Sequence, residues 1–198
     1  MLALNNDPCG SRLCPFESGL KSNLCGWEEL LDLKDIDMLF LPLVEGKHFY
    51  LVVFDLYRYD IYLIDHMADG ESDVSLRDHD EYVCKTTPFR VKHILVAYLE
   101  LVKHPKAAIM CSAVIRRESL AWTMTRRGAS PNVDSAIFMM RHMERFLGTR
   151  CNFFCGFSSH GSRKKAQCNY FRKKYASQIL LSAVNKYHGG VRHRIDRK

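Results

Sequence analysis

The chain has 198 residues, of which 47% are apolar and 26% are charged, a composition that favours one folded domain and excludes a disordered chain. No apolar run approaches the roughly 18–20 residues of a membrane-spanning helix, and the N-terminus lacks the basic and apolar regions of a signal peptide. We therefore expect no membrane contact and a location in the nucleus or the cytoplasm.

The net charge of +7 is unevenly distributed along the chain. Residues 149–198 contain 12 lysines and arginines and a single acid, Asp196, whereas residues 1–148 contain 17 lysines and arginines against 21 acids, a net charge of −4. Such a basic segment can attract nucleic acid or an acidic partner, but a solvated helix face followed by a basic tail explains the same residues. Because no recognisable reading motif accompanies it, we expect at most weak, salt-sensitive nucleic-acid contact.

The eight cysteines show no tight pairing, and in a reducing compartment most would be free thiols. Cys151, Cys155, His160 and Cys168 look superficially like zinc ligands, but their spacing fits no common zinc module well. Ordinary thiols are the preferred interpretation, and we expect neither a metal nor another cofactor.

The N-terminal residues 1–26 are interpreted as a loose leader, since they mix Asn, Asp, Pro, Gly and Ser without periodicity. Residues 27–187 are predicted to form one domain, and residues 188–198 a basic tail. The domain is expected to start with a short helix from Trp27, whose apolar side is supplied by Leu30, Leu31 and Leu33.

Three β-rich runs follow, Asp37–Val44, His48–Leu56 and Asp60–Asp65. The linkers between them are as short as hairpins require, so these runs predict an antiparallel meander. Residues 68–88 are polar and are interpreted as a loop.

Apolar residues at helical spacing predict a helix over Phe89–His104, which Pro105 would end. A further strand is expected over Ser119–Thr125. The next helix follows a turn-rich segment, with Asp134 and Ser135 as N-cap candidates and Gly148 as the first residue after its end. On this helix we expect a core stripe of Phe138, Met139, Met143 and Phe146, with His142 as a packed or surface residue. Trp27 and Trp122 are expected to pack.

Gly161–Ala166 is interpreted as a loop, and a final amphipathic helix is predicted from Gln167 to about Lys186. Its apolar positions are Tyr170, Phe171, Tyr175, Ile179, Leu180 and Val184. The order of these elements predicts an α+β domain with a small antiparallel sheet flanked by helices.

Three residues form a candidate catalytic group. His48 opens a strand, Asp65 ends the next strand, and Ser135 lies at the expected start of a helix. A base, a carboxylate that orients it and a hydroxyl at a helix N-terminus suit nucleophilic catalysis. Taken alone this pattern is weak, because these residue types are common at strand ends.

The sequence segments around these residues resemble those of the ubiquitin-like-protease family of SUMO-specific cysteine peptidases, in its plant-type version. The runs LFLPLVEGKHFYLVVFDL and YDIYLID resemble its His and Asp strands, VDSAIFMMRHMERFLG its nucleophile helix, and FRKKYASQILLSAVN its closing helix. The resemblance covers about residues 27–187. It implies a papain-like, adenain-like fold, with His48 as general base, Asp65 orienting it, Ser135 at the nucleophile position and a SUMO-type modifier as partner.

The sequence departs from the family at three positions. Ser135 replaces the nucleophilic cysteine, Ala136 replaces the usual glycine, and Ala129 and Ser130 occupy the positions of the glutamine that donates to the oxyanion. A serine hydroxyl lacks the easily formed thiolate of such a site, and a lost oxyanion donor typically costs about 10²–10³ in turnover. The resemblance therefore implies a cysteine-type peptidase that is impaired or inactive.

Two other classes of function stay open. One is a binding module, a decayed peptidase that still recognises a ubiquitin-like protein. The other is a nucleic-acid-associated fragment of a mobile-element-derived protein that acts through its basic C-terminal segment. An upstream nucleic-acid-binding domain in the full-length transcript would favour the second.

Overall fold

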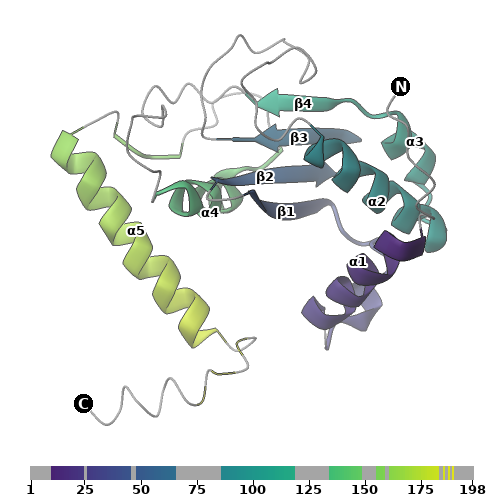
Figure 1. Cartoon of the computed structure of the whole chain (residues 1–198), viewed down its shortest axis with the longest axis horizontal. Helices are drawn as coiled ribbons and strands as arrows, with labels where there is room; N and C mark the ends of the chain where they lie inside the picture. The colour runs from purple at the N-terminus through teal and green to yellow at the C-terminus, as the bar shows by residue number, and fades with distance from the viewer. Residues whose placement is uncertain are drawn as a thin grey trace.

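The computed structural model describes residues 10–24, 26–45, 48–65, 86–118, 134–148, 155–158, 161–182, 185, 187 and 189. Within this part of the chain, helices flank one small sheet (Figure 1), so the predicted α+β class is confirmed. In chain order the elements are α1 (Gly10–Asn23), the 3₁₀ helix η1 (Glu28–Leu30), β1 (Met38–Glu45), β2 (His48–Asp55), β3 (Asp60–Ile64), α2 (Thr87–Leu101), α3 (Ala107–Ser112), β4 (Ile115–Glu118), α4 (Ser135–Arg145) and α5 (Gly161–Leu181). None of the described helices is long and apolar enough to cross a membrane.

The sheet has the order β1-β2-β3-β4. Strands β1 to β3 pair antiparallel, with Leu51 opposite Ile64 between β2 and β3, which confirms the predicted meander. Strand β4 pairs parallel to β3 after α2 and α3, and it was not predicted. Its four residues include one apolar side chain, Ile115, and so carry no strand pattern.

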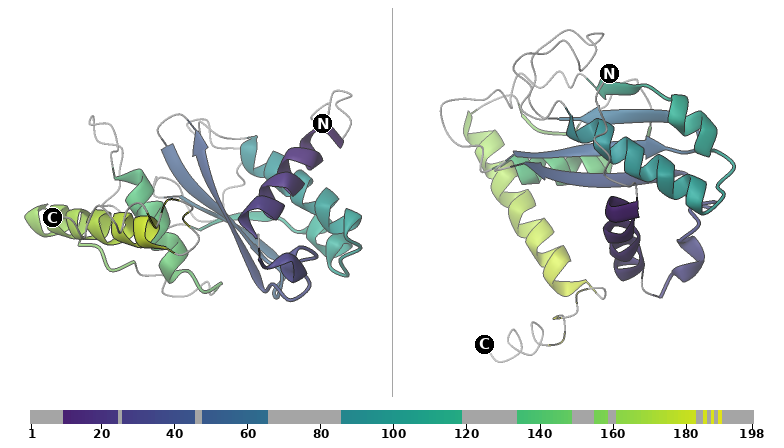
Figure 2. Two further views of the ribbon diagram at one scale, coloured as in Figure 1. Left: turned by 90° about the horizontal axis from the view of Figure 1, so that it is seen from below. Right: turned by 45° about the vertical axis from the view of Figure 1, so that its right-hand side comes forward.

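Alternation along β2 gives the sheet two apolar faces, because successive strand side chains point to opposite sides. Tyr50, Val52 and Phe54 belong to a buried cluster that includes residues of α2 and α3, and residues of α1 pack against it. Leu51 and Val53 belong to a second cluster with residues of α4, residues 155–158 and α5. Figure 2 shows these two groups of helices on opposite sides of the sheet.

The N-terminal region corrects two expectations. Gly10–Asn23 forms α1 instead of a loose leader. Leu13, Phe16 and Leu20 pack against the cluster on α2, and Phe16 meets the Tyr98 ring edge-on at 5.6 Å. This packing outweighs the weak local helix signal of a segment that contains Pro15 and glycines. The predicted short helix is the single turn η1, and Trp27, expected to pack, is exposed.

The predicted limits of two other helices need correction, and one short helix was not predicted. Helix α2 begins at Thr87, inside the predicted loop, and it ends at Leu101; the short helix α3 was missed. Helix α5 begins at Gly161, so the predicted loop over Gly161–Ala166 is wrong; the run Arg163-Lys164-Lys165 consists of good helix formers. The predicted strand over Ser119–Thr125 and Trp122 lie outside the described residues.

The core stripe predicted on α4 is confirmed at three of its four positions. Phe138, Met139 and Phe146 are buried, whereas Met143 is exposed. His142 is buried and therefore packed. On α5 the predicted apolar face is wrong at Tyr170, Ile179 and Leu180, which are exposed, because the stripe that reaches the protein body consists of Cys168, Phe171 and Tyr175.

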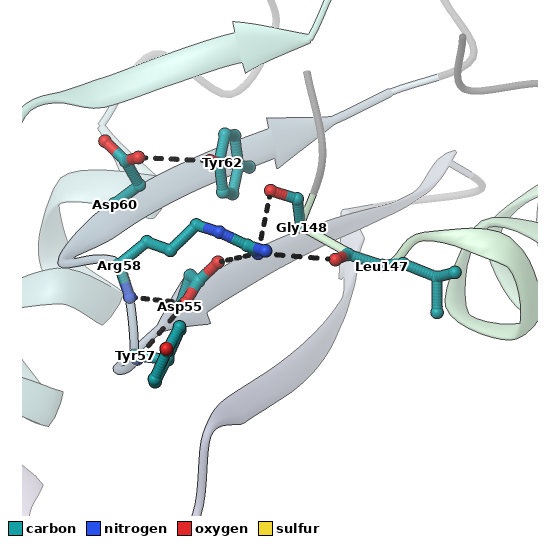
Figure 3. Close-up of polar contacts among 7 residues, drawn as sticks. All are labelled: Asp55, Tyr57, Arg58, Asp60, Tyr62, Leu147 and Gly148. Carbon is teal, nitrogen blue, oxygen red and sulfur yellow. Dashed lines mark hydrogen bonds and ion pairs between the residues drawn. The ribbon is translucent and has the colours of Figure 1, made fainter. Parts of the chain in front are cut away.

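A polar contact ties the β2–β3 turn to the end of α4 (Figure 3). The buried Asp55 carboxylate accepts hydrogen bonds from the Tyr57 and Arg58 amides, at 3.1 and 2.8 Å, and from Arg58 Nη1 at 3.3 Å. The same Nη1 donates to the carbonyl oxygens of Leu147 and Gly148, at 3.4 and 3.1 Å. Helix α4 already ends at Arg145, so Gly148 is not the first residue after it; its φ of +70° instead brings its carbonyl to Arg58.

We expect Gly148→Ala to lower the free energy of unfolding by about 2 kcal/mol, from a left-handed backbone and a steric clash. A Cβ at this position would lie 2.6 Å from Arg58 Nη1, 2.6 Å from Asp55 Oδ2 and 2.8 Å from Met38 Cε. Gly161→Ala is the matched control, since its φ is +80° and no heavy atom lies within 4 Å of the added Cβ. Urea denaturation should show the larger loss for Gly148→Ala; equal losses would contradict the role of the clash.

Candidate functional site

His48 and Asp65 lie toward the same end of the sheet. His48 is the first residue of β2, opposite Glu45 of β1, and Asp65 directly follows β3. Since β2 and β3 run antiparallel with Leu51 opposite Ile64, the start of β2 and the end of β3 lie at the same end of the sheet. Asp65 is buried, whereas the side chain of His48 lies outside the described part of the chain.

Ser135, the third predicted residue, begins α4, which packs along β2. The residues just beyond α4 meet Arg58 at the β2–β3 turn, the far end of β2 from His48. Ser135 thus opens a helix that contacts the strand begun by His48, on the face of the sheet that carries Leu51 and Val53. The convergence of the three side chains stays a prediction.

The buried state of Ser135 limits what the site can do. Only 1% of the residue is exposed to solvent, and Asp65 is 2% exposed. A substrate carbonyl must come within about 3 Å of a nucleophilic oxygen, and the surrounding protein covers this hydroxyl. Attack by Ser135 would therefore require its surroundings to move.

The start of α4 is held by an ion pair instead of the predicted cap. Asp134 occupies the N-cap position but makes no side-chain capping hydrogen bond. Its Oδ1 instead accepts from Arg172 Nη2 of α5 at 2.5 Å. The carboxylate thus fixes α5 against the beginning of α4 and leaves the first amides of the helix to other acceptors.

Neither buried thiol in the described residues replaces the missing nucleophile. Cys168 of α5 interacts electrostatically with Asp134 at the start of α4, but burial and then Asp134 raise its pKa. Burial likewise raises the pKa of Cys155. Both groups are therefore neutral thiols near pH 7, and the thiolate is the nucleophilic form.

Cys155 and Cys168 also belong to the quartet considered as zinc ligands. Both are free thiols, while Cys151 and His160 lie outside the described residues. Among the residues that the structure describes, no group of three or more potential ligands could hold a metal ion.

A charged cluster between α4 and α5 was missed by the sequence analysis. Arg141, which is buried, donates from Nε to the Cys155 carbonyl at 2.7 Å and from Nη1 to Glu144 Oε2 at 2.5 Å. Glu144 also accepts hydrogen bonds from Lys174 and from the Tyr175 hydroxyl. Burial alone would raise the pKa of Glu144, but the hydrogen bonds from Lys174, Arg141 and Tyr175 lower it to about 2.

This lowered pKa predicts a loss of stability in acid. The folded-state pKa of Glu144 lies below its unfolded value of 4.5. The ionised carboxylate therefore contributes to the free energy of unfolding above pH 4.5, and this contribution is lost as the pH falls toward about 2. We expect Glu144→Gln to cost about 1 kcal/mol at pH 7, after allowance for solvent screening. In urea denaturation from pH 7 to pH 2, the difference in free energy of unfolding between Glu144→Gln and wild type should shrink below pH 4.5. A difference that does not change with pH would contradict this prediction.

These features define an α+β domain in which helices flank a small four-stranded sheet and one of the helices begins with a buried serine. No protein-family model matches the chain, and no curated protein matches its sequence. Among solved structures it is similar to "SUMO protease Ulp1 with the catalytic cysteine oxidized to a sulfenic acid", at 16% sequence identity and a TM-score of 0.45. The match covers 84% of this chain and 68% of that one.

Proposed function

We propose that the chain is a peptidase-like domain of the ubiquitin-like-protease type that has lost efficient catalysis and binds a SUMO-type or related modifier. The proposal is supported by the sequence resemblance of residues 27–187, by the positions of His48 and Asp65 at one end of the sheet, and by Ser135 at the start of α4. One observation carries the loss of activity: Ser135, at the nucleophile position, is a serine and is buried.

Chemistry explains why this replacement weakens hydrolysis. A thiol at a helix N-terminus beside an imidazolium forms a thiolate readily, whereas a serine hydroxyl must lose its proton to His48 as it attacks. Asp65 would orient His48 in either case. The proton transfer requires His48 within hydrogen-bond reach of the Ser135 Oγ, and a site shaped for sulfur does not guarantee that distance.

We expect the wild-type chain to show no hydrolysis above background on a panel of modifier–fluorophore substrates that includes SUMO and ubiquitin. His48→Ala should therefore leave the signal unchanged. Brisk cleavage by wild type that His48→Ala abolishes would show a working serine nucleophile and disprove the loss of catalysis.

The binding half of the proposal has a separate test, which does not depend on catalysis. Titration of the same unlabelled modifiers into the wild-type chain by calorimetry should give saturable binding of one of them. If none binds, the proposed partner is wrong, even where hydrolysis is absent as expected.

Contact with nucleic acid through the basic C-terminal segment stays a prediction. On α5, Arg172 and Lys174 form ion pairs with Asp134 and Glu144, so part of the positive charge is already neutralised within the chain.

A further inference from the structure

A buried histidine joins two segments that are distant in the sequence. His104 follows α2, and only 4% of the residue is exposed. Its ring Nε2 lies 3.3 Å from the Leu33 carbonyl oxygen, and its Nδ1 accepts a hydrogen bond from the Lys106 amide at 3.1 Å. Because a carbonyl oxygen can only accept and an amide N–H can only donate, these two partners select the neutral ring with its proton on Nε2.

The segment that His104 holds, residues 31–36, lies between η1 and β1. Leu33 has a left-handed backbone with a φ of +58°, which is unfavourable for a residue other than glycine, while its side chain is buried in the cluster that includes residues of α2 and α3. The Tyr98 hydroxyl of α2 also donates to the Leu31 carbonyl at 2.6 Å. Contacts from α2 and the residues just beyond it therefore keep a locally unfavourable conformation in place.

Protonation of this ring conflicts with its surroundings. A second proton, on Nδ1, would face the N–H group of Lys106, so that two donors would point at each other. Burial lowers the pKa of His104 below its ordinary value of 6.5, although the hydrogen bond with the Leu33 carbonyl opposes this effect. Among the described residues, the charged side chains that act on the ring are Lys106, before α3, and Asp32 and Lys34, on either side of Leu33; the two lysines oppose the charged ring and Asp32 favours it.

We propose that His104 is a pH-dependent switch, which holds residues 31–36 against the end of α2 while its ring is neutral and releases them in mild acid. Release brings the ring into water, where it takes up a proton near pH 6.5, whereas the closed form takes it up only at a lower pH. The stabilisation of the closed form is thus present above pH 6.5 and is lost as the pH falls through the lower pKa of the closed form. Glu144 titrates only below pH 4.5, so the segment opens while the charged cluster between α4 and α5 is still intact.

Amide hydrogen exchange at pH 7.5 and pH 5.5, corrected for the intrinsic effect of pH on exchange, measures the opening of residues 31–36. In the wild-type chain we expect their protection to fall by about threefold or more at the lower pH, while the protection of β2 and β3 stays constant. His104→Gln can still donate to the Leu33 carbonyl but does not titrate, so its protection should be the same at both pH values. His93→Gln, which replaces an exposed histidine of α2, is the matched control and should behave like wild type.

The ring itself gives a second measurement, which needs no variant. The nitrogen chemical shifts of His104 in wild type should show a proton on Nε2 alone at pH 7.5, and a proton on Nδ1 would overturn the proposal. If His104→Gln does not fold, His104→Asn, which keeps an acceptor for the Lys106 amide, takes its place. The proposal is also wrong if residues 31–36 of wild type are equally protected at both pH values, if their protection falls equally in the variant that does not titrate, or if β2 and β3 lose protection together with them.

Discussion

Replacing Arg141 by leucine is expected to lower the free energy of unfolding by about 2 kcal/mol, as is typical when a buried acceptor loses its hydrogen-bond donor. The guanidinium lies 4.5 Å from the centre of the Phe171 ring of α5, donates to the Cys155 carbonyl, and pairs with Glu144 of its own helix. Leucine fills a similar space, but it leaves the Cys155 carbonyl without this donor in a buried region. It also removes one of the hydrogen bonds to Glu144.

Arg145→Leu is the matched control for this substitution. Arg145 lies one turn further along α4 and is exposed, so its replacement should change stability by less than about 0.5 kcal/mol. Urea denaturation followed by circular dichroism measures both variants. Arg141→Lys keeps the charge and should lie between wild type and Arg141→Leu, which preserves the test if the leucine variant fails to fold. A loss below about 1 kcal/mol for Arg141→Leu would show that the network is not a main support of the α4–α5 interface.

The parts of the fold that could be predicted are those in which local pattern and tertiary packing agree. Strands β2 and β3 alternate apolar side chains between two buried faces, and short linkers fix their antiparallel order. Helix α2 likewise shows regular apolar spacing. In α1, by contrast, Pro15 and the glycines hide a helix that forms because Phe16 and Leu20 find a surface on α2, and a sequence pattern does not contain that surface.

The candidate site divides in the same way. The sequence could place His48, Asp65 and Ser135 at element ends, because strand and helix limits follow from local pattern. It could not predict that the Asp134 carboxylate pairs with Arg172, 38 residues away, instead of capping the helix. In the sequence, Arg141 and Glu144 look like ordinary surface charges of an amphipathic helix. Arg141 is nevertheless buried, and its guanidinium lies over the Phe171 ring of α5, a neighbour that the local pattern does not indicate. The three-residue spacing of this pair is the one local signal that indicated an interaction.

Ser135→Cys alone is expected to restore little hydrolysis of a modifier–fluorophore substrate. The thiol would lie at the first residue of α4, where the helix N-terminus favours the thiolate, as His48 would at its predicted position, but no glutamine would donate to the oxyanion.

Adding Ala129→Gln or Ser130→Gln to Ser135→Cys should raise turnover by up to about 10²–10³-fold, the usual value of one oxyanion donor. The matched control is Glu at the same position, which has nearly the same size but carries no N–H group. His48→Ala should abolish the activity of the rebuilt variant, because the thiol would lose its base. Initial rates for the single, Gln and Glu variants on one substrate test whether the missing oxyanion donor limits turnover. If neither Gln variant exceeds its Glu control, the missing donor is not what limits this site, and the burial of residue 135 becomes the stronger explanation.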